Sequence, residues 1–209
     1  MLEQSKITSS KKWLEAKKTG IGGSEISVLM GIHPYATPRE LYEAKIGTGK
    51  ITEQNEQMTA GLSLESYIAR AFRKAKPEYK VVNPRTLYRR DGIALATPDR
   101  LLTTNGEIVG VLELKNTTYW SKVKRTMAAY QVQWYLYVLG VEFGYVCALE
   151  QGWKVHIQPI LRDDECIARM KAKAEDFWCN HVEQRLPPDE DLSGLRHTLP
   201  SEFTSAFRV

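Results

Sequence analysis

The chain has 209 residues, 43% of them hydrophobic and 26% charged, with a formal net charge of +4. This is enough apolar material for the core of one globular domain. No run of about 18 apolar residues is present, and the start MLEQSKITSSKKW lacks the apolar centre of a secretory signal, so we expect no membrane span and a cytoplasmic protein.

Cysteine and basic residues limit the kinds of partner. The three cysteines are widely spaced and form no CxxC pair, which argues against a disulfide framework, a zinc site or an iron–sulfur site. The mildly basic charge permits a nucleic-acid partner without demanding one. Clusters of Lys and Arg fit either solvated faces or contacts to phosphate, and they lie at residues 11–18, 70–76, 85–90 and 122–125.

Helix signals begin near the start of the chain. A short helix is expected in SSKKWLEAKK, residues 9–18. The next segment, GIGGSEISVLMG, predicts a glycine loop followed by a helix that is capped by Ser24 and ends at Gly31.

Two further helices are expected before residue 76. Thr37, Pro38 and Glu40 supply an N-cap, a proline in the first turn and a capping-box acid, which predict a helix to about residue 46. A longer helix is expected over residues 53–75.

The pattern then changes to short β-branched or aromatic segments bounded by Gly, Pro and Asn, as in strands. Five such segments are YKVVNPRTLYRR, GIALATPDRLLTT, EIVGVLELKNT, VEFGYVCALEQ and WKVHIQPIL. Between the third and fourth, SKVKRTMAAYQVQWYLYVLG predicts a crossover helix ending at Gly140, and a last amphipathic helix is expected over residues 163–185. This order predicts an α/β fold with a mixed central β-sheet of about five strands flanked by helices.

The stretch ATPDRLLTTNGEIVGVLELK, residues 96–115, places charges inside apolar strands around an Asn-Gly hairpin turn. A two-residue turn would leave Asp99 and Glu113 on opposite faces of the sheet. A three-residue loop with a bulge would set the two carboxylates opposite each other, which is unfavourable unless a cation lies between them. Glu113 and Lys115 share a face in either arrangement.

Two carboxylates beside a lysine suggest a specific chemistry. Oxygen ligands of this kind suit magnesium or manganese. A neighbouring lysine could orient or deprotonate a metal-bound water, or stabilise charge on a phosphate, as metal-assisted phosphodiester hydrolysis requires. The alternative is a surface hairpin with an ordinary alternation of Glu and Lys.

Asp99 in TPD, followed by Glu113 and Lys115 in ELK, matches the PD-(D/E)xK nuclease signature in residue type and separation. More specifically, the chain resembles the phage lambda exonuclease and YqaJ-type viral recombinase branch of that superfamily. Five blocks carry this resemblance in order across residues 13–140: WLEAKKTGIGGSEIS, AGLSLESYIARAF, TPDR, LELKNT and AYQVQWYLYVLG. Beyond residue 149 only the secondary-structure pattern matches. The resemblance implies the restriction-endonuclease-like fold.

The resemblance also implies roles for individual residues. Asp99 and Glu113 match the metal-ligand carboxylates, and the backbone carbonyl of Leu114 is expected as a further ligand. Lys115 matches the catalytic lysine, which activates water or stabilises the transition state. Two helix residues complete the expected site: Glu65, which faces the metals directly or through water, and Gln131, which holds the lysine or the water.

The glycine loop acquires a role from the same resemblance. In this family it belongs to a pocket for the 5′-phosphate of a duplex end, which here implies Gly22, Gly23 and Ser24 together with a basic residue four positions after Trp13. That position holds Lys17 rather than arginine, and a lysine offers no bidentate fork for the phosphate. Backbone N–H groups at a helix start suit an anion. The alternative is a flexible loop with a serine cap.

The function implied by the resemblance is a Mg²⁺-dependent 5′-to-3′ exonuclease on double-stranded DNA ends, with Mn²⁺ as a possible substitute and two ions per site. It further implies a ring-shaped homotrimer, a single-strand annealing protein as partner, and a role in phage or prophage recombination inside a bacterial host. One nuclease domain, 1–209, is expected. It would consist of a helical 5′-end-binding portion (1–75), a catalytic sheet with its crossover helix (76–162), and a C-terminal helix and tail (163–209).

Two other functions fit parts of the sequence. A PD-(D/E)xK endonuclease of repair or restriction would use the same acids and lysine without the end-binding pocket. A non-catalytic DNA-end-binding module would retain the fold, but the intact set of acids and lysine argues against it.

Overall fold

The computed structural model describes residues 1–7, 9–49 and 56–189, with the side chains of 10, 11 and 56–62 left aside. The first residues of the long predicted helix, 53–55, and the tail from residue 190 onward lie outside these ranges. Within them, no helix combines the length and the apolar character required to cross a bilayer.

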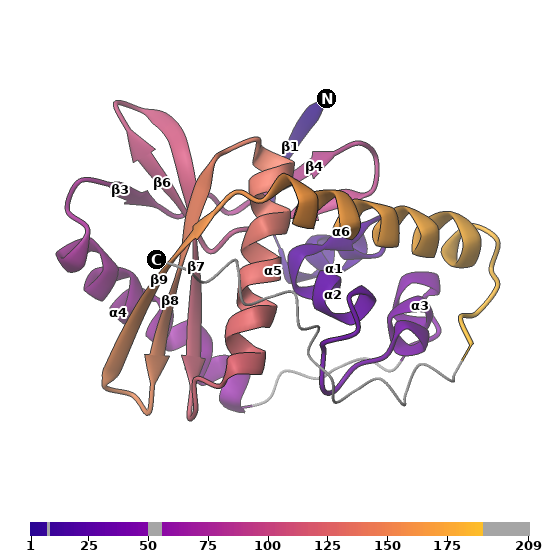
Figure 1. Ribbon diagram of the computed structural model, residues 1–209, viewed down its shortest axis with the longest axis horizontal. Coiled ribbons are helices and arrows are strands. Elements are labelled where there is room, and N and C mark those ends of the chain that lie inside the picture. The colour runs from indigo at the N-terminus through magenta and orange to yellow at the C-terminus, as the bar shows by residue number, and fades with distance from the viewer. Residues whose placement is uncertain (8, 50–55, 190–209) are drawn as a thin grey trace.

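A five-stranded mixed sheet forms the centre of the molecule, in the order β3-β6-β7-β8-β9 (Figure 1). The strands β7 and β8 run parallel because the helix α5 crosses between them. The other three neighbouring pairs are antiparallel. The strands are β3 (Lys80–Val82), β6 (Arg100–Thr104), β7 (Glu107–Thr117), β8 (Phe143–Glu150) and β9 (Lys154–Leu161). The predicted α/β fold with a mixed five-stranded sheet is confirmed.

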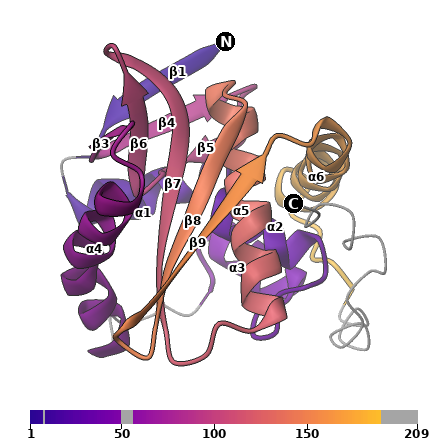
Figure 2. The same ribbon diagram turned by 60° about the vertical axis from the view of Figure 1, so that its left-hand side comes forward.

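Helices cover both faces of this sheet (Figures 1 and 2). On one face α4 (Glu56–Ala75) packs Ile68 and Phe72 against Leu112 and Leu114 of β7. On the other face α5 (Lys122–Leu139) packs against residues such as Val111. Because successive strand residues point to opposite faces, odd-numbered residues of this part of β7 point toward α5. Glu113 and Lys115 therefore share the α5 face.

A second sheet of four short strands, in the order β1-β4-β5-β2, was not predicted. Two of the five predicted strand segments each divide between the two sheets at a proline, Pro84 in the first and Pro98 in the second. Proline has no N–H to donate to a ladder, which explains why both segments break there. The strands of this sheet are β1 (Leu2–Lys6), β2 (Ile21–Gly22), β4 (Thr86–Arg90) and β5 (Ala94–Ala96).

Three of the remaining helices lie beyond α5 on the same side (Figure 1). They are α2 (Gly23–Leu29), α3 (Pro38–Ile46) and α6 (Asp164–Phe177), the last continued by a π-helical turn, Trp178–Val182. The helix α1 (Ser10–Lys17) precedes β2 in the chain. The predicted capping box of α3 is present: Thr37 accepts from the Glu40 N–H, and the Glu40 carboxylate accepts from the Thr37 N–H at 2.8 Å. The predicted cap of α2 is wrong, because Ser24 lies inside the helix and Gly22 occupies the N-cap position.

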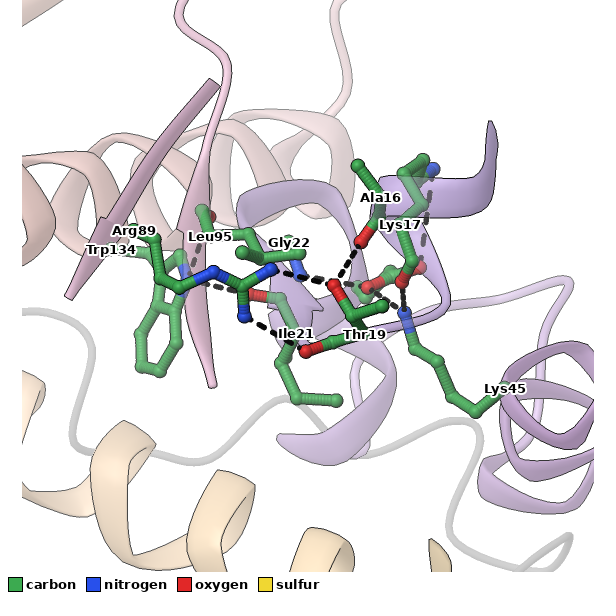
Figure 3. Close-up of polar contacts among 10 residues, drawn as sticks. Ala16, Lys17, Thr19, Ile21, Gly22, Lys45, Arg89, Leu95 and Trp134 are labelled. Carbon is green, nitrogen blue, oxygen red and sulfur yellow. Dashed lines mark hydrogen bonds and ion pairs between the residues drawn. The ribbon is translucent and has the colours of Figure 1, made fainter. Parts of the chain in front are cut away.

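Trp134 joins α5 to the second sheet. Its side chain is buried, and its indole Nε1 donates to the carbonyls of Ile21 on β2 (3.0 Å) and Leu95 on β5 (3.1 Å) (Figure 3). The largest buried side chain thus has its one polar atom satisfied, as a buried indole requires. This contact fixes the start of α2 relative to the helix that carries Gln131.

Candidate active site

The hairpin between β6 and β7 brings the carboxylates of Asp99 and Glu113 together. It combines the two alternatives considered for the sequence, a two-residue turn and a bulge. The turn has two residues, Asn105 and Gly106, both at positive φ, and Thr104 pairs with Glu107. The register then shifts by one between Leu102 and Thr103, so that Leu102 pairs with Gly110 rather than Val109.

This β-bulge decides which residue faces Glu113. Beyond it Arg100 pairs with Leu112, and continuing the register by one residue sets Asp99 opposite Glu113. The Asp99 carboxylate accepts a hydrogen bond from the Leu114 N–H at 2.7 Å. A bulge inside the strand, rather than a longer turn, therefore produces the juxtaposition.

Buried Glu113 and partly exposed Lys115 form an ion pair held by a helix residue. The Lys115 Nζ donates to Glu113 Oε1 at 2.7 Å and to Gln131 Oε1 at 2.8 Å. Glu113 is 3% exposed, and its second oxygen, Oε2, is buried with no hydrogen-bond partner in the described part of the chain. An unpaired buried carboxylate oxygen is costly, which marks this atom as prepared for a ligand.

The electrostatics of the pair favour a bound cation. Burial, followed by the nearby Glu113 carboxylate, raises the pKa of Asp99 well above its ordinary value. Burial also raises the pKa of Glu113, although Lys115 opposes this. Burial lowers the pKa of Lys115, but Glu113 and Asp99 outweigh it and the net direction is upward, so the lysine is held as an ammonium. Two carboxylates share one ammonium, which leaves excess negative charge.

Glu65 reaches the site from α4 but is engaged by an arginine. Its Oε2 lies 3.2 Å from Nη1 of Arg100, and the same guanidinium nitrogen donates to the backbone carbonyl of Asp99. Arg100 is buried at 8% exposure. Arg100 thus links Glu65 to the backbone of Asp99. The sequence analysis assigned no role to Arg100.

Gln131 is fixed on its other side by Tyr135, one turn further along α5. The Gln131 Nε2 donates to the Tyr135 hydroxyl at 2.8 Å, and that hydroxyl donates to the Thr97 carbonyl at 3.4 Å. Burial, followed by Glu113 and Asp99, raises the pKa of Tyr135 well above its ordinary value, so it remains a neutral phenol. The amide oxygen of Gln131 therefore points at Lys115 because its amide nitrogen is already used.

The glycine loop is organised around an internal carboxylate. Glu25 Oε2 accepts from the Gly22 N–H at 2.7 Å and from the buried Lys45 Nζ at 2.7 Å. Lys45 also donates to the Lys17 carbonyl at the end of α1 (Figure 3). The Gly22 N–H is thus occupied by the chain's own acid and is not open to an external anion. The sequence analysis did not identify Glu25 or Lys45 as part of this loop. The position of Glu25, three residues after Gly22, is nevertheless the spacing of a capping box.

Lys17 and Ser24, predicted to act together, are separated. The Lys17 ammonium lies 3.9 Å from Glu25 Oε1 and 4.6 Å from the centre of the Trp13 ring. Ser24 lines a pocket of about 240 Å³ that also contains Lys115 and Gln131, and Lys17 does not line it. Gly23 permits α2 to approach α5, because an added Cβ would lie 2.6 Å from the Tyr135 ring.

A second pocket, of about 530 Å³, opens on the carboxylate side of the cluster. Its lining includes Glu65, Asp99 and Arg100 together with Trp13 of α1 and Arg85. Asp99 thus lines this pocket, which holds two carboxylates and two guanidinium groups, whereas Lys115 lines the pocket of Ser24.

The donor set fits a hard divalent cation. Oxygen atoms come from Asp99 and from the unpaired Glu113 Oε2, the type of ligand that Mg²⁺ and Mn²⁺ prefer. Among the described residues no group of three or more His, Cys, Asp or Glu is close enough to hold a metal by itself. Any ion here would complete its shell with backbone carbonyl, water or phosphate oxygens, as Mg²⁺ usually does.

Solved structures of other proteins share the fold of this chain. The chain superimposes on an alkaline exonuclease from Laribacter hongkongensis, LHK-Exo, with a TM-score of 0.64 at 17% identity over 85% of this chain and 94% of that one. A phage-related exonuclease from Haemophilus somnus 129PT gives a TM-score of 0.59 at 13% identity over 83% of this chain and 99% of that one. These likenesses show that the chain shares the fold of these two exonucleases.

Sequence relatives give the family. The uncharacterized protein YqaJ of Bacillus subtilis (strain 168) is 32% identical over 193 residues, which cover 87% of this chain and 59% of that protein. The chain thus spans about three fifths of the length of this curated relative. The model of the YqaJ-like viral recombinase domain matches residues 12–142, which include every residue placed in the site above. The chain belongs to the YqaJ-like viral recombinase family.

Proposed function

We propose that this protein is a divalent-metal-dependent nuclease that digests one strand of linear duplex DNA in the 5′-to-3′ direction and leaves a 3′ single-stranded tail for recombination. The observation that carries the proposal is the cluster of Asp99, Glu113 and Lys115. It contains two adjacent carboxylates, one unpaired buried oxygen and an ammonium fixed by Gln131. The family and the exonuclease folds support the reaction class.

Asp99 and Glu113 would hold the metal together with the Leu114 carbonyl, and Glu65 would contribute directly or through water. Mg²⁺ is the expected ion, Mn²⁺ a substitute, and two ions per site the expected occupancy. When bound, such ions polarise the scissile phosphate and lower the pKa of a coordinated water.

The chain's own residues have separate tasks in this scheme. The Lys115 ammonium stabilises negative charge that develops on the phosphate oxygens. Gln131 fixes that ammonium because its amide is locked by Tyr135. Arg100 links Glu65 to the backbone of Asp99, which would keep Glu65 near the metal site.

The finer features of the proposal rest on the resemblance. The resemblance assigns the pocket for the 5′-phosphate to Gly22, Gly23, Ser24 and Lys17. Of these four, Ser24 shares a pocket with Lys115, whereas Glu25 already accepts the Gly22 N–H and pairs with Lys17. A homotrimeric ring around DNA, an annealing protein that receives the tail, and a cytoplasmic role in phage or prophage recombination belong to the same proposal.

Nucleotide release from one linear duplex, prepared with a 5′-phosphate or a 5′-hydroxyl, tests the proposal in Mg²⁺ and in EDTA. We expect release in Mg²⁺ only, faster from the phosphorylated end. Lys115→Ala should abolish release, whereas Lys173→Ala, which removes an exposed lysine of α6, should not.

Three outcomes would contradict parts of this. Release that begins at 3′ ends would overturn the polarity. Cutting of a closed circular duplex would indicate the endonuclease alternative. Tight DNA binding without any hydrolysis and without heat of Mg²⁺ binding would indicate the non-catalytic end-binding module.

A further inference from the structure

The pocket that contains Ser24 continues past Lys115 to the loop between β7 and α5, and its chemistry differs from that of the carboxylate side. Its polar lining consists of hydroxyls (Ser24, Ser27, Thr117), the Asn116 and Gln131 amides, the His33 imidazole, the Trp120 indole and the ammonium groups of Lys115 and Lys124. Among the described residues no carboxylate lines it. We name it the Lys124 pocket.

Lys124 holds a positive charge without an anionic partner. It lies on the first turn of α5, partly buried, and its Nζ donates to the Thr117 hydroxyl at 2.6 Å. Thr117 in turn donates to the Tyr119 carbonyl at 3.1 Å, which fixes the tether. In the described part of the chain no carboxylate lies within ion-pair distance of Lys124. A partly desolvated ammonium that contacts only a neutral hydroxyl is stabilised when an anion enters.

Other lysines near the site differ in this respect. Lys115 is paired with Glu113, and both Lys17 and Lys45 are paired with Glu25. Their charges are compensated within the protein. Lys124 is the pocket lysine whose charge is available to a ligand.

His33 adds a donor on the opposite wall. Its Nδ1 accepts the backbone N–H of Tyr35 at 3.2 Å, so the proton of the neutral imidazole resides on Nε2. Hydroxyl, amide and imidazole donors around an ammonium suit the oxygens of a phosphate.

We propose that the Lys124 pocket binds a phosphate of the DNA strand next to the phosphate at Lys115, and that Lys124, rather than Lys17, supplies the charge. The inference rests on the proposed function, because it takes DNA as the substrate. The phosphate is either the terminal 5′-phosphate or an internal phosphodiester, since both present the same oxygens to the pocket.

Binding measured without hydrolysis tests this assignment. Fluorescence anisotropy in EDTA would follow the dissociation constants of two labelled duplexes, one with a 5′-phosphate and one with a 5′-hydroxyl, over a range of salt concentrations. The variants are Lys124→Gln, which keeps a hydrogen-bonding group near Thr117, Lys124→Arg, which keeps the charge, and Lys122→Gln, which removes an exposed lysine from the same turn. Circular dichroism melting curves would establish that each variant is folded.

For Lys124→Gln we expect binding weaker by about tenfold or more, as for one hydrogen bond to a charged group. We also expect the slope of log K against log salt to fall by roughly 0.7–0.9, the value for one phosphate contact. Lys124→Arg should keep the wild-type slope, and Lys122→Gln should stay close to wild type. A loss confined to the phosphorylated duplex assigns the pocket to the terminal phosphate, and an equal loss on both duplexes assigns it to an internal one.

Two results would overturn the inference: unchanged affinity and slope for Lys124→Gln, or an equal change for Lys122→Gln, which would show a general effect of surface charge. Failure of DNA to bind wild-type protein would overturn it as well. Because the assay needs no hydrolysis, absence of nuclease activity would contradict the proposed function while leaving this result intact.

Discussion

Glu113 shows at the scale of one residue how a site opposes the stability of its own fold. Its carboxylate is buried, lies opposite Asp99 and has one oxygen without a hydrogen-bond partner among the described residues. Each of these features costs free energy in the absence of a cation. In the proposed function the same features would favour metal binding, so the residue would serve function at the expense of the unliganded fold.

Glu113→Gln should therefore stabilise the metal-free protein and remove its response to Mg²⁺. The substitution keeps the shape and removes one of two repelling charges. A gain of about 1 kcal/mol would raise the Tm of a domain of this size by about 2–4 °C. Calorimetric melting in EDTA and in Mg²⁺ measures both effects, since a ligand of the native state raises Tm with its concentration. A variant that melts below wild type in EDTA would contradict the prediction.

Glu150 is a second carboxylate with a strong local environment, at the end of β8. It accepts from the Trp120 N–H at 2.7 Å and contacts His156 Nε2 at 2.8 Å. The Trp120 hydrogen bond, followed by that of His156, lowers the pKa of Glu150. It thereby holds the loop that leads from β7 into α5 and carries Trp120 to the wall of the Lys124 pocket.

The sign of the pH effect follows from this lowered pKa. A folded-state pKa below the unfolded one means that the ionised carboxylate contributes stability above the unfolded value and that this contribution disappears as pH falls through the folded value. Glu150→Gln should be less stable than wild type at pH 7, and the difference in Tm should shrink as pH falls below about 4.3, the ordinary pKa of Glu. Equal Tm differences at pH 7 and at pH 3.5 would disprove the role of the charge.

At the scale of elements, the contact between α2 and α5 sets the position of Gln131. Gly23 lies against this contact, and a Cβ there would meet the Tyr135 ring at 2.6 Å and the Gln131 Cγ at 3.1 Å. Gly22, its neighbour, has room, with the closest atom of Glu25 at 3.5 Å. Gly22 and Gly23, the last two glycines of GIGG, thus differ in the space that surrounds them.

Gly23→Ala should destabilise the protein by about 1–3 kcal/mol, the usual cost of overpacking, and should slow nucleotide release because Gln131 is displaced from Lys115. Gly22→Ala is the matched control, with a smaller loss from a poorer N-cap. Urea unfolding and nucleotide release, measured on both variants, give the comparison. Similar losses for the two would show that the close approach does not matter.

The sequence predicted elements well where local signals were strong and missed those that depend on distant pairing. The capping box at Thr37 and the Gly140 stop were recognised because such signals act within one turn. Strands β1 and β2 were missed because their hydrogen-bond partners, β4 and β5, lie far along the chain. Ser24 was misplaced as a cap because the helix begins earlier, after an N-cap at Gly22 whose N–H donates to the Glu25 carboxylate three residues further on.

The candidate site was predicted in its residue types but not in its connections. The spacing of Asp99, Glu113 and Lys115 left two registers open, and only the position of the bulge decides between them. The ties of Arg100 to Glu65 and of Tyr135 to Gln131 join separate elements, and no short motif encodes such contacts. The roles of all these residues remain predictions that the experiments above address.

At the scale of the whole molecule, the two pockets beside the site differ in the groups that line them. One pocket is lined by carboxylates together with guanidinium groups, and the other by ammonium and neutral polar groups without a described carboxylate. A phosphate chain that crosses the site would have one phosphate at the metal ligands and the next at Lys124. This polarity offers a physical reason for digestion of a strand in one direction.

The proposed ring makes a prediction for the same scale. In solution the protein should have about three times the 23.8 kDa mass of one chain. Light scattering coupled to size-exclusion chromatography measures this directly, at low and at physiological salt. A mass of one chain at micromolar concentration would contradict the trimer, and it would leave the chemistry of the single site unaffected.

The bulge that leaves Val109 unpaired limits the changes of length that the β6–β7 hairpin can tolerate. Consecutive residues of a strand point to opposite faces, so the loss of one residue between 103 and 109 would turn Glu113 and Lys115 away from Gln131 or move them out of line with Asp99. The distance along the chain from Asp99 to Glu113 matters more than the side chains between them. Substitutions in TTNGEI should be tolerated, whereas a change of length by a single residue should abolish activity, so the genetic record of this segment should contain exchanges but not single-residue insertions or deletions.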